Sequence, residues 1–157
     1  MTPAPVRQLL VARDVMSKPP ICVHPDATVR EVAKILEENE ISGLPVVDEQ
    51  ERPLGVISRT DLLRGILEGA PGRRPDESFL ELLSADEASP FSIDFEEFGP
   101  ADEWMTPDPV TAPLDAPLAA LARAMTEERV HRVVVVDRDG RVAGMVTTLD
   151  LLAHFPS

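Results

Sequence analysis

The stretch Gly55-Val56-Ile57-Ser58-Arg59-Thr60-Asp61 occurs twice in this chain in closely related form. Its second copy, Gly144-Met145-Val146-Thr147-Thr148-Leu149-Asp150, begins 89 positions later. The same offset aligns the preceding residues of the two halves without a gap, so that Val46-Val47-Asp48 falls on Val135-Val136-Asp137. Self-similarity over such a span indicates a duplicated structural unit, and the chain is therefore interpreted first as a tandem repeat.

Composition and charge bound the class of protein. The 157 residues are 43% hydrophobic and 27% charged, which is typical of a globular chain with one core or two small halves sharing one. The net charge of −13 argues against nucleic acid and anionic membranes as main partners. The single cysteine excludes an internal disulfide and is typical of a reducing compartment. Because residues 1–10 also lack the layout of a signal peptide, we expect a cytoplasmic protein.

Each repeat predicts the element order strand, helix, strand, strand, helix. In the first repeat Thr28 and Glu31 have the spacing of a capping box, which predicts a helix that begins at Thr28 and ends near Asn39. Short apolar runs separated by turn residues predict the strands, and the second repeat follows the same plan. The expected elements are strands over 21–23, 44–47 and 54–58 with a helix over 61–67, and then strands over 110–112, 133–136 and 142–147 with helices from Pro117 and over 149–154.

The repeats divide the chain into four segments. We expect a leader over 1–14, in which residues 6–11 could form a short helical turn, a first repeat over 15–67 and a second over 104–157. Between the repeats lies an insert over 68–103, whose eleven acidic residues and two arginines give it a net charge of −9. The acidity alone would suggest disorder, but the insert also holds four of the five phenylalanines, which indicates that part of it packs.

Two units of this kind in tandem resemble a pair of cystathionine-β-synthase (CBS) domains, the Bateman module. The resemblance is carried by Val15-Met16-Ser17, by residues 41–48 and by residues 55–61, and in the second repeat by residues 104–106, 130–137 and 144–150. It implies a mixed α/β (α+β) fold of two β-α-β-β-α repeats, packed as a pseudo-two-fold pair with two clefts between the halves. It also implies that the clefts bind adenosine-containing ligands, that the protein regulates another and catalyses nothing itself, and that helices of two chains meet in a homodimer. A monomer whose helices only cover their own sheets is the alternative.

A hydroxyl and a carboxylate three residues apart stand at the end of the hairpin in each repeat, as Ser58 and Asp61 and as Thr147 and Asp150. A carboxylate at this place can accept both hydroxyl hydrogens of a ribose. The same spacing is also a plain capping signature of a helix start, and the two interpretations are compatible.

Phosphate binding is predicted at His131 and Arg132, because the family contacts phosphate at this pair and Arg offers planar paired donors. A surface pair at a helix–strand junction is the alternative. The resemblance assigns the pair to the cleft of Asp61, and Arg59 could assist there. Ser42 and Gly43 stand at the matching place in the first repeat without positive charge, so we expect unequal clefts.

Adenine is expected against the first short strand of each repeat, where backbone groups can read the base edge. This pocket would comprise Pro20, Ile21, Cys22 and Val23 in one cleft and Pro109, Val110 and Thr111 in the other. A small buried thiol that fills core is, however, the commoner interpretation of a cysteine such as Cys22.

No catalytic or metal site is predicted. The three histidines, His24, His131 and His154, are too scattered for a metal motif, and no Gly-rich phosphate loop is present in the sequence. The function expected is a stand-alone regulatory protein that binds AMP, ADP or ATP as a regulatory ligand, with accompanying Mg²⁺ left open, and signals to an unknown partner. The alternatives are a ligand-free dimerisation module and a sensor of S-adenosylmethionine.

Overall fold

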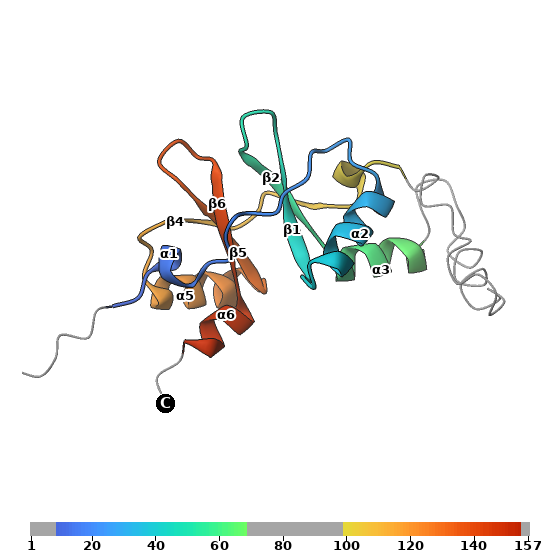
Figure 1. Ribbon diagram of the computed structural model, residues 1–157. Helices are drawn as coiled ribbons and strands as arrows, with labels where there is room; N and C mark the ends of the chain where they lie inside the picture. The colour runs from blue at the N-terminus through green and yellow to red at the C-terminus, as the bar shows by residue number, and fades with distance from the viewer. Residues whose placement is uncertain (1–8, 69–98, 155–157) are drawn as a thin grey trace, which may run out of the picture. The chain divides into compact units, whose positions relative to one another are not determined.

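The computed structural model describes residues 9–68 and 99–154, which form two compact units (Figure 1). The central unit comprises Ile21–Pro109, and the terminal unit comprises Met1–Pro20 together with Val110–Ser157. Both contain a three-stranded sheet with helices, so the predicted mixed α/β architecture of two repeats is confirmed.

The sheet of the central unit has the strand order β1-β2-β3. Strands β1 (Gly43–Val47) and β2 (Pro53–Ser58) form the predicted antiparallel hairpin, in which Leu44 pairs with Ile57. Strand β3 (Thr106–Pro107) pairs antiparallel with β2 on its other side. All five residues of β1 are buried, as expected for a short apolar strand in the middle of a core.

Two helices cover this sheet, α2 (Val29–Glu38) and α3 (Arg59–Glu68). The predicted capping box of α2 is present, because Glu31 N donates to Thr28 Oγ1 over 3.1 Å and Thr28 N donates to Glu31 Oε2 over 3.2 Å. The helix ends at Asn39, as predicted. Its apolar face lies in a core cluster of ten buried residues, namely Val23, Val29, Val32, Leu36, Leu44, Val46, Ile57, Leu62, Ala101 and Trp104.

The terminal unit repeats the plan with the strand order β4-β5-β6. Strand β4 (Thr111–Pro113) runs parallel to β5 (Arg132–Val136), and β5 pairs antiparallel with β6 (Val142–Thr147). The helices are α1 (Ala12–Val15), α5 (Leu118–Glu128) and α6 (Thr148–Ala153), and Pro117 occupies the N-cap position of α5. Its core cluster contains Ala12, Val15, Ala112, Ala116, Leu121, Met125, Val133, Val135 and Val146.

The compact units do not follow the order of the repeats along the chain. Met16 and Ser17 open the first repeat in sequence, yet they lie in the terminal unit, where Ser17 N donates to Met145 O over 3.0 Å. Met105 and Thr106 open the second repeat, yet they lie in the central unit, where Thr106 pairs with Val56. Each opening segment therefore pairs with the hairpin of the other repeat, Thr106 within strand β3 and Ser17 through a single bridge, which was not anticipated from the sequence.

Glycines make room for these opening segments. A Cβ atom at Gly55 would lie 2.6 Å from both Met105 Sδ and the backbone oxygen of Thr106. At Gly144 the corresponding atom would lie 2.7 Å from Met16 Sδ and 2.6 Å from the backbone oxygen of Ser17. The first residue of the duplicated stretch is therefore glycine because another backbone passes directly over it.

A few boundaries differ from the sequence-based expectations. The short helix of the leader lies at Ala12–Val15, and residues 9–11 of the expected turn are not helical, with Val11 in a bridge with Pro117. Residues 6–8 of that prediction lie outside the described residues. Residues 21–23 supply only a single bridge, between Val23 and Val46. Helix α3 begins two residues earlier than predicted, and α6 begins and ends one residue earlier. The expectations about the insert fall almost entirely on 69–98 and lie outside the described residues.

Candidate functional site

The predicted ribose acid of the central unit, Asp61, lies in the first turn of α3, directly after β2. Its Oδ2 accepts hydrogen bonds from Ser58 N over 2.8 Å and from Ser58 Oγ over 2.9 Å, and Asp61 N donates back to Ser58 Oγ over 3.2 Å. The capping interpretation of this motif is therefore confirmed. Oδ2 of Asp61 takes part in the cap, whereas Oδ1 contacts residues outside it.

The outer oxygen of Asp61, Oδ1, accepts a hydrogen bond from Thr106 Oγ1 over 3.3 Å. Arg64 Nη1 lies 3.7 Å from the same oxygen, one helical turn further along α3. These contacts leave the Asp61 side chain only 9% exposed. Neither Thr106 nor Arg64 was predicted as a site residue from the sequence, although Arg64 stands at helical spacing from Asp61.

The second acid, Asp150, stands at the equivalent place at the start of α6. Its Oδ2 accepts a hydrogen bond from Thr147 N over 2.8 Å, and Asp150 N donates to Thr147 Oγ1 over 3.2 Å. Ser17, at the repeat position of Thr106, donates its hydroxyl to Met145 O over 3.2 Å. Among the residues that the structure describes, none donates to Asp150 Oδ1. The two acids therefore share the cap and differ in their outer oxygen.

The predicted phosphate residues lie beside the second of these junctions. His131 is exposed and immediately precedes β5, and its carbonyl accepts from Thr148 N over 2.9 Å. Arg132 is half-buried and pairs with Thr147 across the sheet. Both residues belong to the terminal unit, like Asp150. The assignment of this pair to the cleft of Asp61 stays a prediction.

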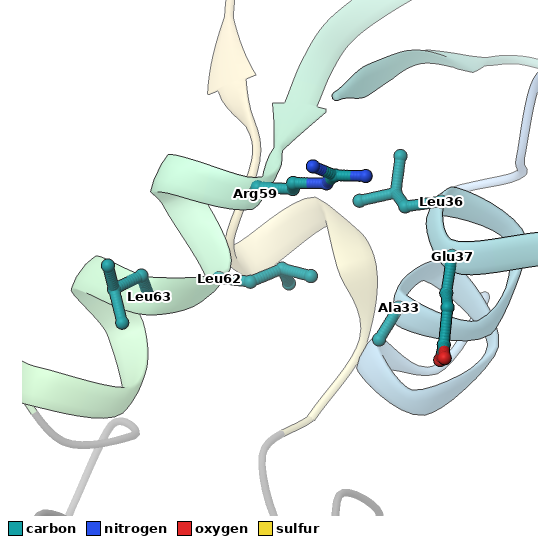
Figure 2. Close-up of a pocket in the computed structure, with 6 residues that line it drawn as sticks. All are labelled: Ala33, Leu36, Glu37, Arg59, Leu62 and Leu63. Atoms are coloured by element: carbon teal, nitrogen blue, oxygen red, sulfur yellow. The ribbon is translucent and has the colours of Figure 1, made fainter. Parts of the chain in front are cut away.

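Arg59, the third predicted phosphate residue, lies over a groove between α2 and α3 (Figure 2). The groove has a volume of about 380 Å³ and is lined by Ala33, Leu36, Glu37, Arg59, Leu62 and Leu63. Its lining is mostly apolar, and Leu63 is 57% exposed. This helical surface of the central unit is the kind of apolar face that another protein surface can cover.

The predicted adenine segments run beside β1 in the central unit and beside β5 in the terminal unit. Val23 N donates to Pro45 O over 3.1 Å, and Val47 N donates to Val23 O over 2.8 Å. In the terminal unit Val134 N donates to Val110 O over 2.9 Å, and Thr111 pairs with Val134. Ile21 and Pro109, the first and last residues of the central unit, are half-buried. Pro20 belongs to the terminal unit and is exposed.

Cys22 is half-buried between two of these residues and has no disulfide partner. Burial raises the pKa of its thiol from 9.0 to about 11, and the negative charge of Glu51 adds to the increase. The thiol is therefore protonated at neutral pH, which suits a small packing residue and not a nucleophile.

No group of three or more potential ligands from His, Cys, Asp and Glu is arranged to hold a metal ion within 9–68 and 99–154. Over the same part of the chain, no helix has the length and apolar character needed to cross a membrane.

The arrangement of both units has clear counterparts among known proteins. Residues 12–68 and 101–157 each match the CBS domain family. The chain belongs to the CBS-domain family. The structure is similar to the solved CBS domain pair of protein MJ0100 in complex with 5′-methylthioadenosine and S-adenosyl-L-methionine, with a TM-score of 0.71 and 28% identity over 92% of this chain and 94% of that one. It is also similar to CBSX2 in complex with AMP, with a TM-score of 0.66 and 26% identity over 91% and 93% of the two chains.

Two relatives of the chain are longer than the chain itself. The chain is 29% identical over 147 residues to L-aspartate semialdehyde sulfurtransferase of Methanocaldococcus jannaschii, covering 94% of itself and 23% of the relative. It is 31% identical over 128 residues to the chloroplastic CBS domain-containing protein CBSX1 of Arabidopsis thaliana, covering 80% of itself and 54% of the relative. The chain thus spans about a quarter and about half of the lengths of these two relatives, and what they do as whole proteins is not transferred to it.

Proposed function

We propose that this CBS pair is a regulatory module that binds an adenosine-containing ligand through the carboxylates of Asp61 and Asp150. The observation that carries the proposal is the duplicated strand-to-helix junction. In both copies one carboxylate oxygen caps the helix, so the position of the second is fixed. A fixed acceptor pair suits the two hydroxyls of a ribose, and two structures similar to this chain were solved with adenosine derivatives bound.

The ligand class proposed is AMP, ADP or ATP, and S-adenosylmethionine is the second candidate. His131 and Arg132 support a phosphorylated ligand, since they bring an imidazole and a guanidinium to the same end of β5. The similarity to a CBS pair bound to S-adenosyl-L-methionine and 5′-methylthioadenosine supports the other candidate.

We propose no enzymatic activity for the module. Cys22 is held protonated by burial, and the two carboxylates occupy equivalent positions in separate units, which suits duplicated binding. Regulation would follow if the ligand binds two conformations with different affinity, because only a difference in affinity can shift a population that a partner protein reads.

Ligand-dependent thermal unfolding tests the proposal. The protein is heated alone and with AMP, ADP, ATP, adenosine or S-adenosylmethionine, and the ATP titration is repeated with Mg²⁺ and with EDTA. A ligand at a hundredfold excess over its dissociation constant should raise the free energy of unfolding by about 2.7 kcal/mol. The matched control carries Asp61→Asn and Asp150→Asn, since an amide oxygen can keep each cap while the outer acceptor is lost. No shift with any of these compounds at millimolar concentration would refute the proposal.

A specific observation also favours a homodimer. Leu63 and Leu152 occupy the same position in the two repeats, and they are 57% and 59% exposed. Leu149, one turn before Leu152 on α6, is 76% exposed. Each unit therefore carries exposed leucines that a second copy could cover, and the central unit adds the apolar groove between α2 and α3. Light scattering should give twice 17.1 kDa, and a mass of one chain at micromolar concentration would leave the ligand-free dimerisation alternative without support.

A further inference from the structure

The carboxylate of Asp61 accepts three hydrogen bonds from its own unit, and a cation lies close to it. A carboxylate offers about four lone-pair sites to hydrogen-bond donors. Around Asp61 four donor groups approach these sites: Ser58 N at 2.8 Å, Ser58 Oγ at 2.9 Å, Thr106 Oγ1 at 3.3 Å and Arg64 Nη1 at 3.7 Å. A ribose that donates two hydroxyl hydrogens to Asp61 must therefore displace protein donors.

The carboxylate of Asp150, at the equivalent position in the other repeat, accepts fewer hydrogen bonds than that of Asp61. Of the donors that the structure describes, only Thr147 N reaches its carboxylate, at 2.8 Å. The positions that match Thr106 and Arg64 at the repeat offset are Ser17 and Ala153. The hydroxyl of Ser17 donates to Met145 O over 3.2 Å, and the side chain of Ala153 has no hydrogen-bond donor. Within 9–68 and 99–154, the other three sites on Asp150 receive no donor, so these residues leave them available for a ribose.

The two donors at Asp61 Oδ1 differ in strength. Arg64 is 57% exposed, so its ion pair is screened by solvent and contributes little. The hydroxyl of Thr106 is the donor that lies within hydrogen-bond distance of Oδ1. It is held there by the backbone pairing of β3 with β2, where Thr106 is the partner of Val56. Thr106 is therefore the group that a ligand hydroxyl has to replace.

We propose that Thr106 is a specificity-determining residue that closes the ribose acceptor of Asp61, so that the junction at Asp150 binds nucleosides first. This inference rests on the proposed function. It concerns the ribose alone, whereas the predicted inequality of the clefts concerns phosphate. Adenosine is therefore the probe, because it carries the ribose diol without a phosphate.

Calorimetric titration with adenosine on single-junction variants tests the inference. Asp150→Asn leaves only the junction of Asp61, and Asp61→Asn leaves only the junction of Asp150, with both caps retained. Because a hydrogen bond to a charged group has to be exchanged, adenosine should bind about tenfold more weakly to the Asp150→Asn protein than to the Asp61→Asn protein. Adding Thr106→Val to the Asp150→Asn protein should recover about this tenfold difference.

The matched control is Ser17→Ala in the Asp61→Asn protein. Ser17 and Thr106 are both exposed hydroxyl residues at the same repeat position, but the hydroxyl of Ser17 does not contact the acid. Its removal should leave the affinity for adenosine unchanged. Valine at position 106 keeps the β-branched shape that suits a strand, so the variant should fold, and circular dichroism checks this.

The possible results separate the two proposals. If neither the wild-type protein nor any variant binds an adenosine-containing compound, the proposed function fails and this inference falls with it. If adenosine binds but Thr106→Val leaves its affinity unchanged, the proposed function stands and the closure by Thr106 is refuted. If Thr106→Val weakens binding, the hydroxyl contacts the ligand directly, and the inference is also overturned.

Discussion

Replacing Gly65 by alanine should destabilise the protein, although helix propensity predicts the opposite. Gly65 lies inside α3, where alanine is ordinarily favoured over glycine by about 0.5–1 kcal/mol. In this structure the indole ring of Trp104 lies directly on Gly65. A Cβ atom there would lie 2.6 Å from Cη2 of the indole and closer still to Cζ3 and Cε3. Either the ring or the helix must move.

The expected size of the effect follows from the burial of the indole. Trp104 is only 9% exposed and belongs to the core cluster of the central unit, so the ring cannot move without loss of packing. Forcing an extra carbon into such a site typically costs about 1–3 kcal/mol. After subtraction of the gain in helix propensity, Gly65→Ala should lower the free energy of unfolding by about 1 kcal/mol or more.

A second background reverses the sign of this effect and so tests the reasoning. In a Trp104→Leu protein the ring is absent, and Gly65→Ala should then stabilise α3 by about 0.5–1 kcal/mol. The four proteins form a double-mutant cycle with a coupling energy of about 2 kcal/mol. Urea unfolding followed by far-ultraviolet circular dichroism measures all four, because Trp104 is the sole tryptophan and its fluorescence is lost in two of them. Stabilisation by Gly65→Ala in both backgrounds would refute the packing of Trp104 on Gly65.

Three further predictions concern ligand, assembly and pH. Arg132→Ala should weaken AMP at least about tenfold more than adenosine in calorimetric titrations, because a guanidinium bonds phosphate and not the nucleoside, and an equal loss for both would assign Arg132 to the fold. Leu63→Asp combined with Leu152→Asp should shift the light-scattering mass from two chains to one, whereas an unchanged mass would place the interface elsewhere. Since the pKa of the Cys22 thiol is raised to about 11 in the folded protein, the unfolded chain loses this proton first as the pH rises. Stability should therefore fall between pH 9 and pH 11, less so in a Cys22→Ala variant, and identical pH profiles would contradict this origin.

The candidate site combines contacts between near neighbours in the sequence with contacts between distant residues. The junctions at Ser58 and Thr147 were predictable because a cap joins residues three apart, and that spacing is visible in the sequence. The contact between Thr106 and Asp61 spans 45 positions, and only the pairing of β3 with β2 produces it. No periodicity or spacing signals such a contact, and the matching residue Ser17 makes a different one.

By itself, the sequence determined the duplication, the order of elements in each repeat and the ends of helices such as α2. These features depend on hydrophobic periodicity and on hydrogen bonds between near neighbours, so a local stretch is enough to specify them. The tertiary structure alone decided that Met16 packs over Gly144 and Met105 over Gly55, so that each repeat's opening segment pairs with the other repeat's hairpin. The physical reason is that a strand edge accepts any suitable extended segment, and the sequence of that segment does not state which edge it will join.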